Sequence, residues 1–214
     1  MSKVLAVNGS PRMVKGRTEM LLAAFLRGMQ AVGADTDTIY PSRMKIERCD
    51  CNQMLCWFGH PGRCSHKDDM EAVLAQLREV DTVVIASPVY VPLPGALQDF
   101  INRMCPLMDP LLVTRDGRTR ARAREGMAVR RFVAVVTGSW WEKENADTVI
   151  RIVRELAEDT GVEFAGALVR PHAELIGTRR ELSPAGAEVL AAAVKAGRQL
   201  VEDGAMASET LAGR

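Results

Sequence analysis

Residues 3–18, KVLAVNGSPRMVKGRT, join an apolar run to Gly-Ser-Pro and then to the start of a helical pattern. An apolar run with this ending is typical of a buried parallel strand that leaves its sheet into a loop. From Thr18 onward the apolar residues Leu22, Phe25 and Met29 step by three and four positions, which predicts an amphipathic helix. The stretch therefore predicts a strand, a loop and a helix in succession.

The same succession recurs along the chain. Further strands are predicted over residues 35–40, 82–86, 132–137 and 163–169. Further helices are predicted over residues 68–79, 94–108, 145–159 and 184–201. Such alternation predicts an α/β domain whose parallel sheet carries helices on both faces. In this class of fold, ligands bind beyond the carboxyl ends of the strands.

Three segments lie outside this alternation. Residues 43–67 hold four of the five cysteines, and residues 113–131 are basic and polar. No regular pattern continues after Gly204. We therefore expect one domain over residues 1–204, with a cysteine-containing insertion at 43–67, a basic flap at 113–131 and a loose tail at 205–214.

The composition does not indicate a nucleic-acid-binding or membrane-binding protein. Of the 214 residues, 47% are hydrophobic and 26% are charged, and the net charge is +1. The apolar run at the N-terminus is too short for a signal peptide. No apolar run approaches the ~20 residues that are needed to span a bilayer. We expect a cytoplasmic protein without a nucleic-acid or membrane partner.

The loop after the first strand has the groups of a phosphate site. Hydroxyls at Ser10 and Thr18 flank a helix start at Gly16 and Arg17, where backbone amides favour an anion. A Walker A loop does not fit, because its lysine is missing and the glycines lie too far apart. No Gly-x-Gly-x-x-Gly follows the strand, so a monophosphate fits better than a dinucleotide. The alternative is a plain loop in which Thr18 only caps the helix.

The loops after the third and fourth predicted strands lie near the first loop in a sheet of this kind. Residues 87–94 contain three prolines, which stiffen the backbone, and Tyr90 offers a flat aromatic surface. In the next loop, Gly138 allows a close backbone approach, and Thr137 and Ser139 supply hydroxyls. Each loop by itself is also compatible with an ordinary turn. Together they predict a pocket for a phosphate and a planar ring.

Four segments of the chain are typical of one superfamily. They are Gly9-Ser10-Pro11-Arg12 with Gly16-Arg17-Thr18-Glu19, Cys56-Trp57 with Pro61-Gly62-Arg63-Cys64, Asp68-Asp69-Met70, and Ala86-Ser87-Pro88-Val89-Tyr90. In sequence and in order they resemble the NADPH-dependent FMN reductase and flavodoxin-like NAD(P)H oxidoreductase superfamily, over roughly residues 3–170. The resemblance implies a flavodoxin-like fold, with a five-stranded parallel sheet of order 2-1-3-4-5, and FMN as cofactor.

The resemblance also implies where FMN binds. Its phosphate would be held by Ser10, Pro11, Arg12, Arg17 and Thr18. Its ring would lie against Pro88, Val89, Tyr90, Val91, Thr137, Gly138 and Ser139. The flavin then carries the chemistry, so no catalytic side chain is expected.

The implied activity is that of an FMN-dependent NAD(P)H oxidoreductase. A nicotinamide nucleotide would give hydride to the flavin and leave, and a small acceptor would then take the electrons in a ping-pong order. The acceptor would be a free flavin, a quinone, a nitro compound or a metal oxyanion. Because relatives are commonly dimers or tetramers, the resemblance also implies a homodimer or homotetramer.

The cysteines support several hypotheses. Their spacing in the insertion is Cys49-x-Cys51-x4-Cys56-x7-Cys64. Iron–sulfur flavoproteins of the superfamily bind a [4Fe–4S] cluster through a compact cysteine motif, and Cys56 and Cys64 match its last two ligands. Asp50 and Gln53 stand at the first two positions instead. A remnant of the motif without a cluster, a zinc site, a redox-active thiol and simple burial are the alternatives.

Two further alternatives concern function. Residues 115–131 contain seven arginines, which would either bind the 2′-phosphate of NADPH or lie on a solvated flap or an inter-subunit arm. The protein as a whole could also be an iron–sulfur flavoprotein that carries electrons between protein partners. A third reading is a flavodoxin-fold binding domain that has lost its cofactor.

Overall fold

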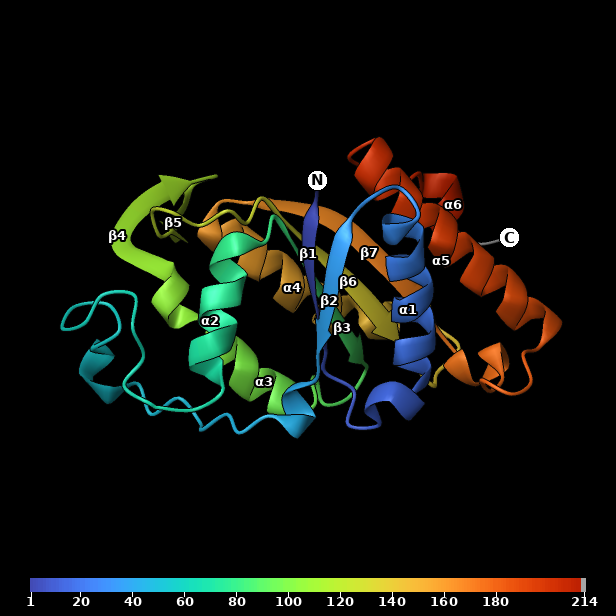
Figure 1. Ribbon diagram of the computed structural model, residues 1–214, viewed down its shortest axis with the longest axis horizontal. Helices are drawn as coiled ribbons and strands as arrows, with labels where there is room; N and C mark the ends of the chain where they lie inside the picture. Colours follow the sequence, from blue (N-terminus) through green and yellow to red (C-terminus); the bar gives the residue numbers. More distant parts are fainter. Residues whose placement is uncertain (213–214) are drawn as a thin grey trace.

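Five parallel strands form the central sheet of the computed structural model, which describes residues 1–212 (Figure 1). The strands are β1 (Lys3–Asn8), β2 (Asp35–Ile39), β3 (Thr82–Pro88), β6 (Arg131–Thr137) and β7 (Glu163–Arg170). Their order across the sheet is β2-β1-β3-β6-β7, and each neighbouring pair is parallel. In chain order this is 2-1-3-4-5, so the predicted flavodoxin-like fold is confirmed.

Helices cover both faces of the sheet, because the strands are apolar on both sides. One face carries α1 (Arg17–Gln30) and α5 (Pro184–Glu202), and the other carries α2 (Met70–Glu79), α3 (Gly95–Asn102) and α4 (Asp147–Thr160). In β1, Val4 and Ala6 pack with α1 and α5, whereas Leu5 and Val7 pack with the other three helices. All four side chains are buried, so the two cores are separated only by the sheet.

The basic stretch forms a hairpin, and the helix predicted over 94–108 ends earlier, at Asn102. β4 (Met108–Arg115) pairs antiparallel with β5 (Arg118–Ala123). Asp116 and Gly117 between them have φ values of 50° and 71°, as a tight two-residue hairpin turn requires.

The arginines of this hairpin are engaged within the chain. Nitrogens of Arg120 lie 2.7 to 2.8 Å from carboxylate oxygens on α4, contributed by Glu155, Glu158 and Asp159. Other hairpin arginines also donate to protein oxygens, namely Arg115, Arg118, Arg122 and Arg124. The contacts of Arg115, Arg118 and Arg120 hold the hairpin on α4. They argue against a free solvated flap, and they leave these arginines engaged within the chain and not open to the 2′-phosphate of NADPH.

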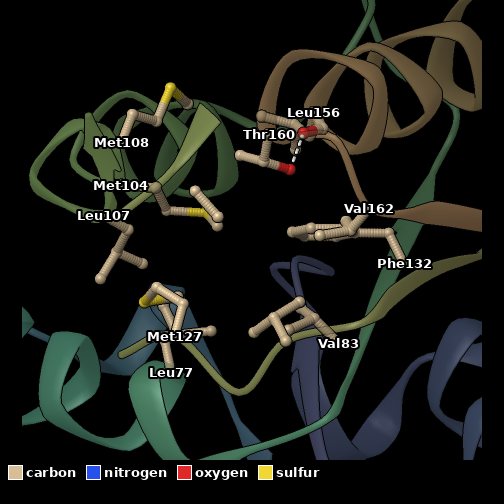
Figure 2. Close-up of a pocket in the computed structure, with 12 residues that line it drawn as sticks. Leu77, Val83, Met104, Leu107, Met108, Met127, Phe132, Leu156, Thr160 and Val162 are labelled. Carbon is tan, nitrogen blue, oxygen red and sulfur yellow. Dashed lines mark hydrogen bonds between the residues drawn. The ribbon is translucent and has the colours of Figure 1, made fainter. Parts of the chain in front are cut away.

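A small apolar cavity of about 20 Å³ lies beneath the hairpin, near the amino ends of β3 and β6 (Figure 2). Figure 2 shows Met104, Leu107 and Met127 around it, with Val83 and Phe132 on the sheet side. A space of this size holds about one water molecule at most, and an apolar lining gives that water no partners. The cavity is therefore a gap in the packing and not a ligand site.

The cysteine-containing insertion is anchored at its end by a buried ion pair. Arg103 donates to the two carboxylate oxygens of Asp68 over 2.7 and 2.9 Å, and both side chains are buried. Arg103 also donates to the carbonyl of Glu47, over 2.7 Å. Burial alone would raise the pKa of Asp68, but hydrogen bonds from Arg103 and two backbone amides lower it to about 2. The pair therefore stays ionised and joins the insertion to α3.

The end of the chain differs from the expected loose tail. Ser208–Ala212 form α6, and Met206 and Thr210 are buried. Met206 packs into the core between the sheet and α5. The expectation is therefore wrong for residues 205–212, and residues 213–214 lie outside the described residues. None of the helices described is long and apolar enough to cross a membrane.

Candidate cofactor site

The three loops singled out in the sequence enclose one pocket of about 120 Å³ at the carboxyl ends of β1, β3 and β6. The predicted binding residues in its lining are Ser10, Arg12, Arg17, Thr18, Pro88, Val89, Tyr90, Thr137, Gly138 and Ser139. Pro11 and Val91 are not in the lining, and the Val91 side chain is fully exposed. The structure thus brings together all the predicted residues except these two.

One end of the pocket is an anion cradle at the start of α1. Gly16 is the N-cap residue of this helix, and no side chain caps its amides. A Cβ at Gly16 would lie 2.9 Å from Ser10 Oγ, so only glycine leaves the cradle open. The Nε atom of Arg17 is buried and has no hydrogen-bond partner within residues 1–212. Free helix amides and an unpaired guanidinium nitrogen are the groups that bind a phosphate.

Asn8 and Glu19 support the backbone of this cradle, and neither was among the predicted binding residues. The buried Asn8 side chain donates to Glu19 Oε2 over 2.7 Å and accepts from the Ser10 amide over 2.9 Å. The two contacts fix the backbone of the loop at Ser10. A polar residue at the last position of an otherwise apolar strand was the signal that could have identified Asn8.

A fourth segment completes the pocket, and it was also not predicted. The amide of Gly138 donates to the carbonyl of Arg170, and the amide of Ala173 donates to the carbonyl of Gly138, over 3.0 and 2.8 Å. Ala173 and Glu174 line the pocket as a result, and Ser139 Oγ donates to Glu174 over 3.2 Å. These contacts hold the loop after β6 against the segment after β7.

Exposed aromatic side chains lie beside the pocket. The ring of Trp141 stacks on His172 with 3.8 Å between centroids, and the His172 amide donates to the carbonyl of Trp140. Both tryptophans are 66% exposed, and Tyr90 in the pocket lining is 52% exposed. Stacking and backbone contacts thus hold large apolar surface in solvent, where planar molecules can pack.

The pocket combines an anion cradle, a stiff loop and aromatic surface. This combination fits the phosphate and planar ring of FMN, with the unpaired Nε of Arg17 available to the phosphate. The lining contains no cysteine, histidine or lysine that could act as a nucleophile or base, and Glu174 is its one carboxylate.

The cysteines of the insertion do not form a comparable site. Cys49 and Cys51 are exposed, Cys56 and Cys64 are half-buried, and all are free thiols. Cys105, which is distant in sequence, lies near the cysteine-containing insertion. The Nε1 atom of Trp57, within the insertion, donates to the carbonyl of Cys105 over 2.9 Å. Within residues 1–212, no three cysteine, histidine or acidic side chains are close enough to hold a metal ion. The arrangement does not fit a [4Fe–4S] cluster or a zinc ion.

The thiols nevertheless affect one another. Burial raises the pKa of Cys105 to about 11, and the nearby Cys56, Cys49 and Cys51 add to this shift. Burial likewise raises the pKa of Cys56, together with the neighbouring Cys64. Burial and the neighbouring thiols thus raise the pKa at both positions in the same direction.

The fold defines a flavodoxin-like protein, and its pocket has the polar and planar groups that a phosphate-bearing planar cofactor would need. Comparison of the sequence with family models identifies its family. The chain belongs to the NADPH-dependent FMN reductase family, whose model matches residues 2–127. The match spans more than half of the chain and includes the first two loops of the pocket.

Individual proteins resemble parts of the chain. An iron–sulfur flavoprotein of Archaeoglobus fulgidus is 33% identical over 106 residues, which cover 49% of this chain and 46% of the relative. A second, from Methanosarcina thermophila, is 29% identical over 104 residues, covering 47% of this chain and 51% of the relative. The chain thus spans about half the length of the curated relatives it matches.

Solved structures share the fold over nearly the whole chain. An NAD(P)H:quinone oxidoreductase from Methanothermobacter marburgensis superposes with a TM-score of 0.65 at 16% identity, covering 93% of this chain and 98% of the other. An FMN-dependent NADH-azoreductase from Bacillus anthracis, solved with FMN, gives 0.63 at 14% identity, covering 96% and 100%. At these identities the likeness establishes the fold alone.

Proposed function

We propose that the protein is an FMN-dependent NAD(P)H oxidoreductase that moves electrons from a nicotinamide nucleotide to a small acceptor. The observation that carries the proposal is the pocket that joins an uncapped helix start, with the unpaired Arg17 Nε, to the loops after β3 and β6. Membership of the FMN reductase family supports it. The acceptor class remains a flavin, a quinone, a nitro compound or a metal oxyanion.

The residues of the chain would act by binding and orienting. Ser10, Thr18 and the amides at the start of α1 hold the phosphate, while Arg17 neutralises part of its charge. Pro88, Val89 and Gly138 form the walls that orient the ring. FMN, when bound, supplies the hydride-accepting and electron-donating chemistry. The nicotinamide nucleotide and the acceptor would then use the open side of the pocket in turn, in ping-pong order.

The exposed aromatic surface supports the proposal of a homodimer or homotetramer. Trp140 and Trp141 would then lie between two subunits and shield the ring site from water. The alternative is that they contact the acceptor directly.

Steady-state oxidation of NADPH tests the activity. The FMN-loaded protein should oxidise NADPH in the presence of menadione, with parallel lines in double-reciprocal plots at several menadione concentrations. The matched variant Gly16→Ala should bind little FMN and lose the activity, whereas Gly95→Ala, whose new Cβ would meet nothing within 4 Å, should keep it. Activity that is equal in both variants would contradict the assigned pocket.

A second candidate is an iron–sulfur flavoprotein that carries electrons between protein partners. The curated relatives that carry this name favour it, together with the four cysteines of the insertion and the nearby Cys105. It requires rearrangement of residues 43–67, because their described positions do not bring ligands together. Iron and sulfide analysis of anaerobically purified protein distinguishes the two candidates. About four irons per chain would support the electron carrier, and no iron would support the FMN-dependent oxidoreductase.

A further inference from the structure

A second cavity, of about 450 Å³, lies between α5, α6 and the edge strand β7. It shares no lining residue with the cofactor pocket. Figure 1 shows α6 beside α5 at the end of the chain. The cavity is larger than the pocket assigned to FMN, which measures about 120 Å³, so it has room for a small molecule.

Two polar groups in the lining have no partner. Thr210 is 9% exposed, and its Oγ1 is buried without a hydrogen bond within residues 1–212. The Nε atom of Arg170 is also buried and unpaired. Buried donors without acceptors are unfavourable, and they are rare in folded proteins. The lining residues thus include polar groups that no residue of the described chain satisfies.

The charges around the cavity favour an anion. Arg170 and Lys143 lie at the end nearest the loop after β6, and Glu188 on α5 is the one carboxylate in the lining. The Arg170 guanidinium makes no ion pair or hydrogen bond within the part of the chain that is described. The backbone carbonyl of Arg170, by contrast, is engaged by the amide of Gly138. The guanidinium is thus free to pair with a carboxylate.

The rest of the lining is apolar and shaped by small side chains. Ala192, Ala193 and Ala196 on α5 face Leu168 on β7, and Leu211 on α6 adds to the wall. Alanines on this helix face leave the space that larger residues would fill. An aliphatic chain or a narrow ring would bury apolar surface there.

We propose that this cavity binds a small amphiphilic carboxylate, with its head group on the Arg170 guanidinium and its hydrocarbon body along the alanine face of α5. The Arg170 guanidinium without a partner in the described chain, and the apolar face formed by the alanines of α5, carry the assignment. No reaction is assigned to the site, and the bound molecule is separate from FMN and from the electron acceptor.

Isothermal titration of the FMN-loaded protein with decanoate tests the proposal. The wild type should bind one decanoate, and 1-decanol, which lacks the charge, should bind about tenfold more weakly or worse. Arg170→Gln should weaken decanoate by a similar factor while retaining the bound FMN. No saturable binding by the wild type, or equal binding of decanoate and decanol, would overturn the proposal.

A matched pair of variants on α5 tests the apolar wall. Ala192→Phe fills the cavity and should abolish decanoate binding, whereas Ala191→Phe, at an exposed position outside the lining, should leave it unchanged. Sedimentation should show the same oligomeric state for both. If the wild type is a dimer that only Ala192→Phe dissociates, the cavity is an interface between copies and the proposal is wrong. If Ala192→Phe does not fold, the decanoate titration of Arg170→Gln still tests the proposal.

Discussion

The Oγ1 atoms of Thr18 and Thr137 lie 2.7 Å apart, although 119 residues separate them in the chain. This buried hydrogen bond joins the start of α1 to the end of β6, and it therefore connects the phosphate end of the pocket with the ring end. The amide of Val89 donates to the Thr137 carbonyl over 2.8 Å, which adds the loop after β3. Thr137 thus contacts both other loops of the pocket.

Thr18→Val should lower the affinity for FMN by about ten- to hundredfold, because it removes a phosphate donor and leaves Thr137 Oγ1 unpaired. Fluorescence quenching of FMN during titration of the apoprotein measures the effect. Thr119→Val, at an exposed strand position, is the control and should bind FMN as the wild type does. Unchanged affinity in Thr18→Val would remove Thr18 from the proposed site.

Gly16→Ala should abolish FMN binding but barely change the stability of the apoprotein. The backbone there has φ −82° and ψ 158°, which alanine adopts readily, so the folded chain is not strained. The added methyl group instead enters the cradle beside Ser10 Oγ. Thermal unfolding of the apoprotein and FMN titration separate the two effects. A large loss of thermal stability would show that the glycine serves the fold.

Asp68→Asn should reduce the free energy of unfolding at pH 7 by about 3 to 5 kcal/mol, because it leaves Arg103 buried without its counter-charge. The pKa of Asp68 is about 2 in the folded protein, below its unfolded value. The ionised carboxylate therefore stabilises the fold above about pH 4 and loses this contribution as the pH falls towards 2.

Urea unfolding at several pH values checks this prediction. The difference in stability between wild type and Asp68→Asn should be full at pH 7 and shrink below pH 4. Asp35→Asn, at an exposed position, is the control and should cost little at any pH. A difference that stays constant from pH 7 to pH 3 would contradict the low pKa of Asp68.

Arg120→Met should destabilise the protein by about 2 to 4 kcal/mol, since it removes the cation that three carboxylates of α4 share. Arg118→Met, a matched change at a 53% exposed side chain, should cost less than about 1 kcal/mol. Neither should alter FMN affinity, because the hairpin packs near the amino ends of the strands. Chemical unfolding and FMN titration test both points; similar costs for the two variants would show that burial does not matter here.

Much of the fold was predictable, because each strand is a short apolar run with a clear end. The register of the sheet places Asn8 beside Ala86 and Pro88 beside Thr137, so the loops that follow these strands converge as predicted. The convergence of the three loops followed from the class of fold alone.

The remainder depends on contacts that single segments do not encode. The hairpin was missed because its arginine-rich, polar sequence was interpreted as a solvated flap. Only the acidic residues of α4 make Arg120 a structural residue. Cys105 joins the other thiols through the position of α3, which no cysteine spacing reveals. Ala173 and Glu174 reach the pocket because β7 ends beside β6. The short α6 has too few residues for its periodicity to be recognised.

The ultraviolet–visible spectrum of the purified protein tests the central claim most directly. After incubation with FMN and removal of free flavin, the account predicts a bound flavin band near ~450 nm that bleaches on anaerobic addition of NADPH. Gly95→Ala should behave in the same way, and Gly16→Ala should show no band. A wild-type protein that retains no flavin under these conditions would contradict the account.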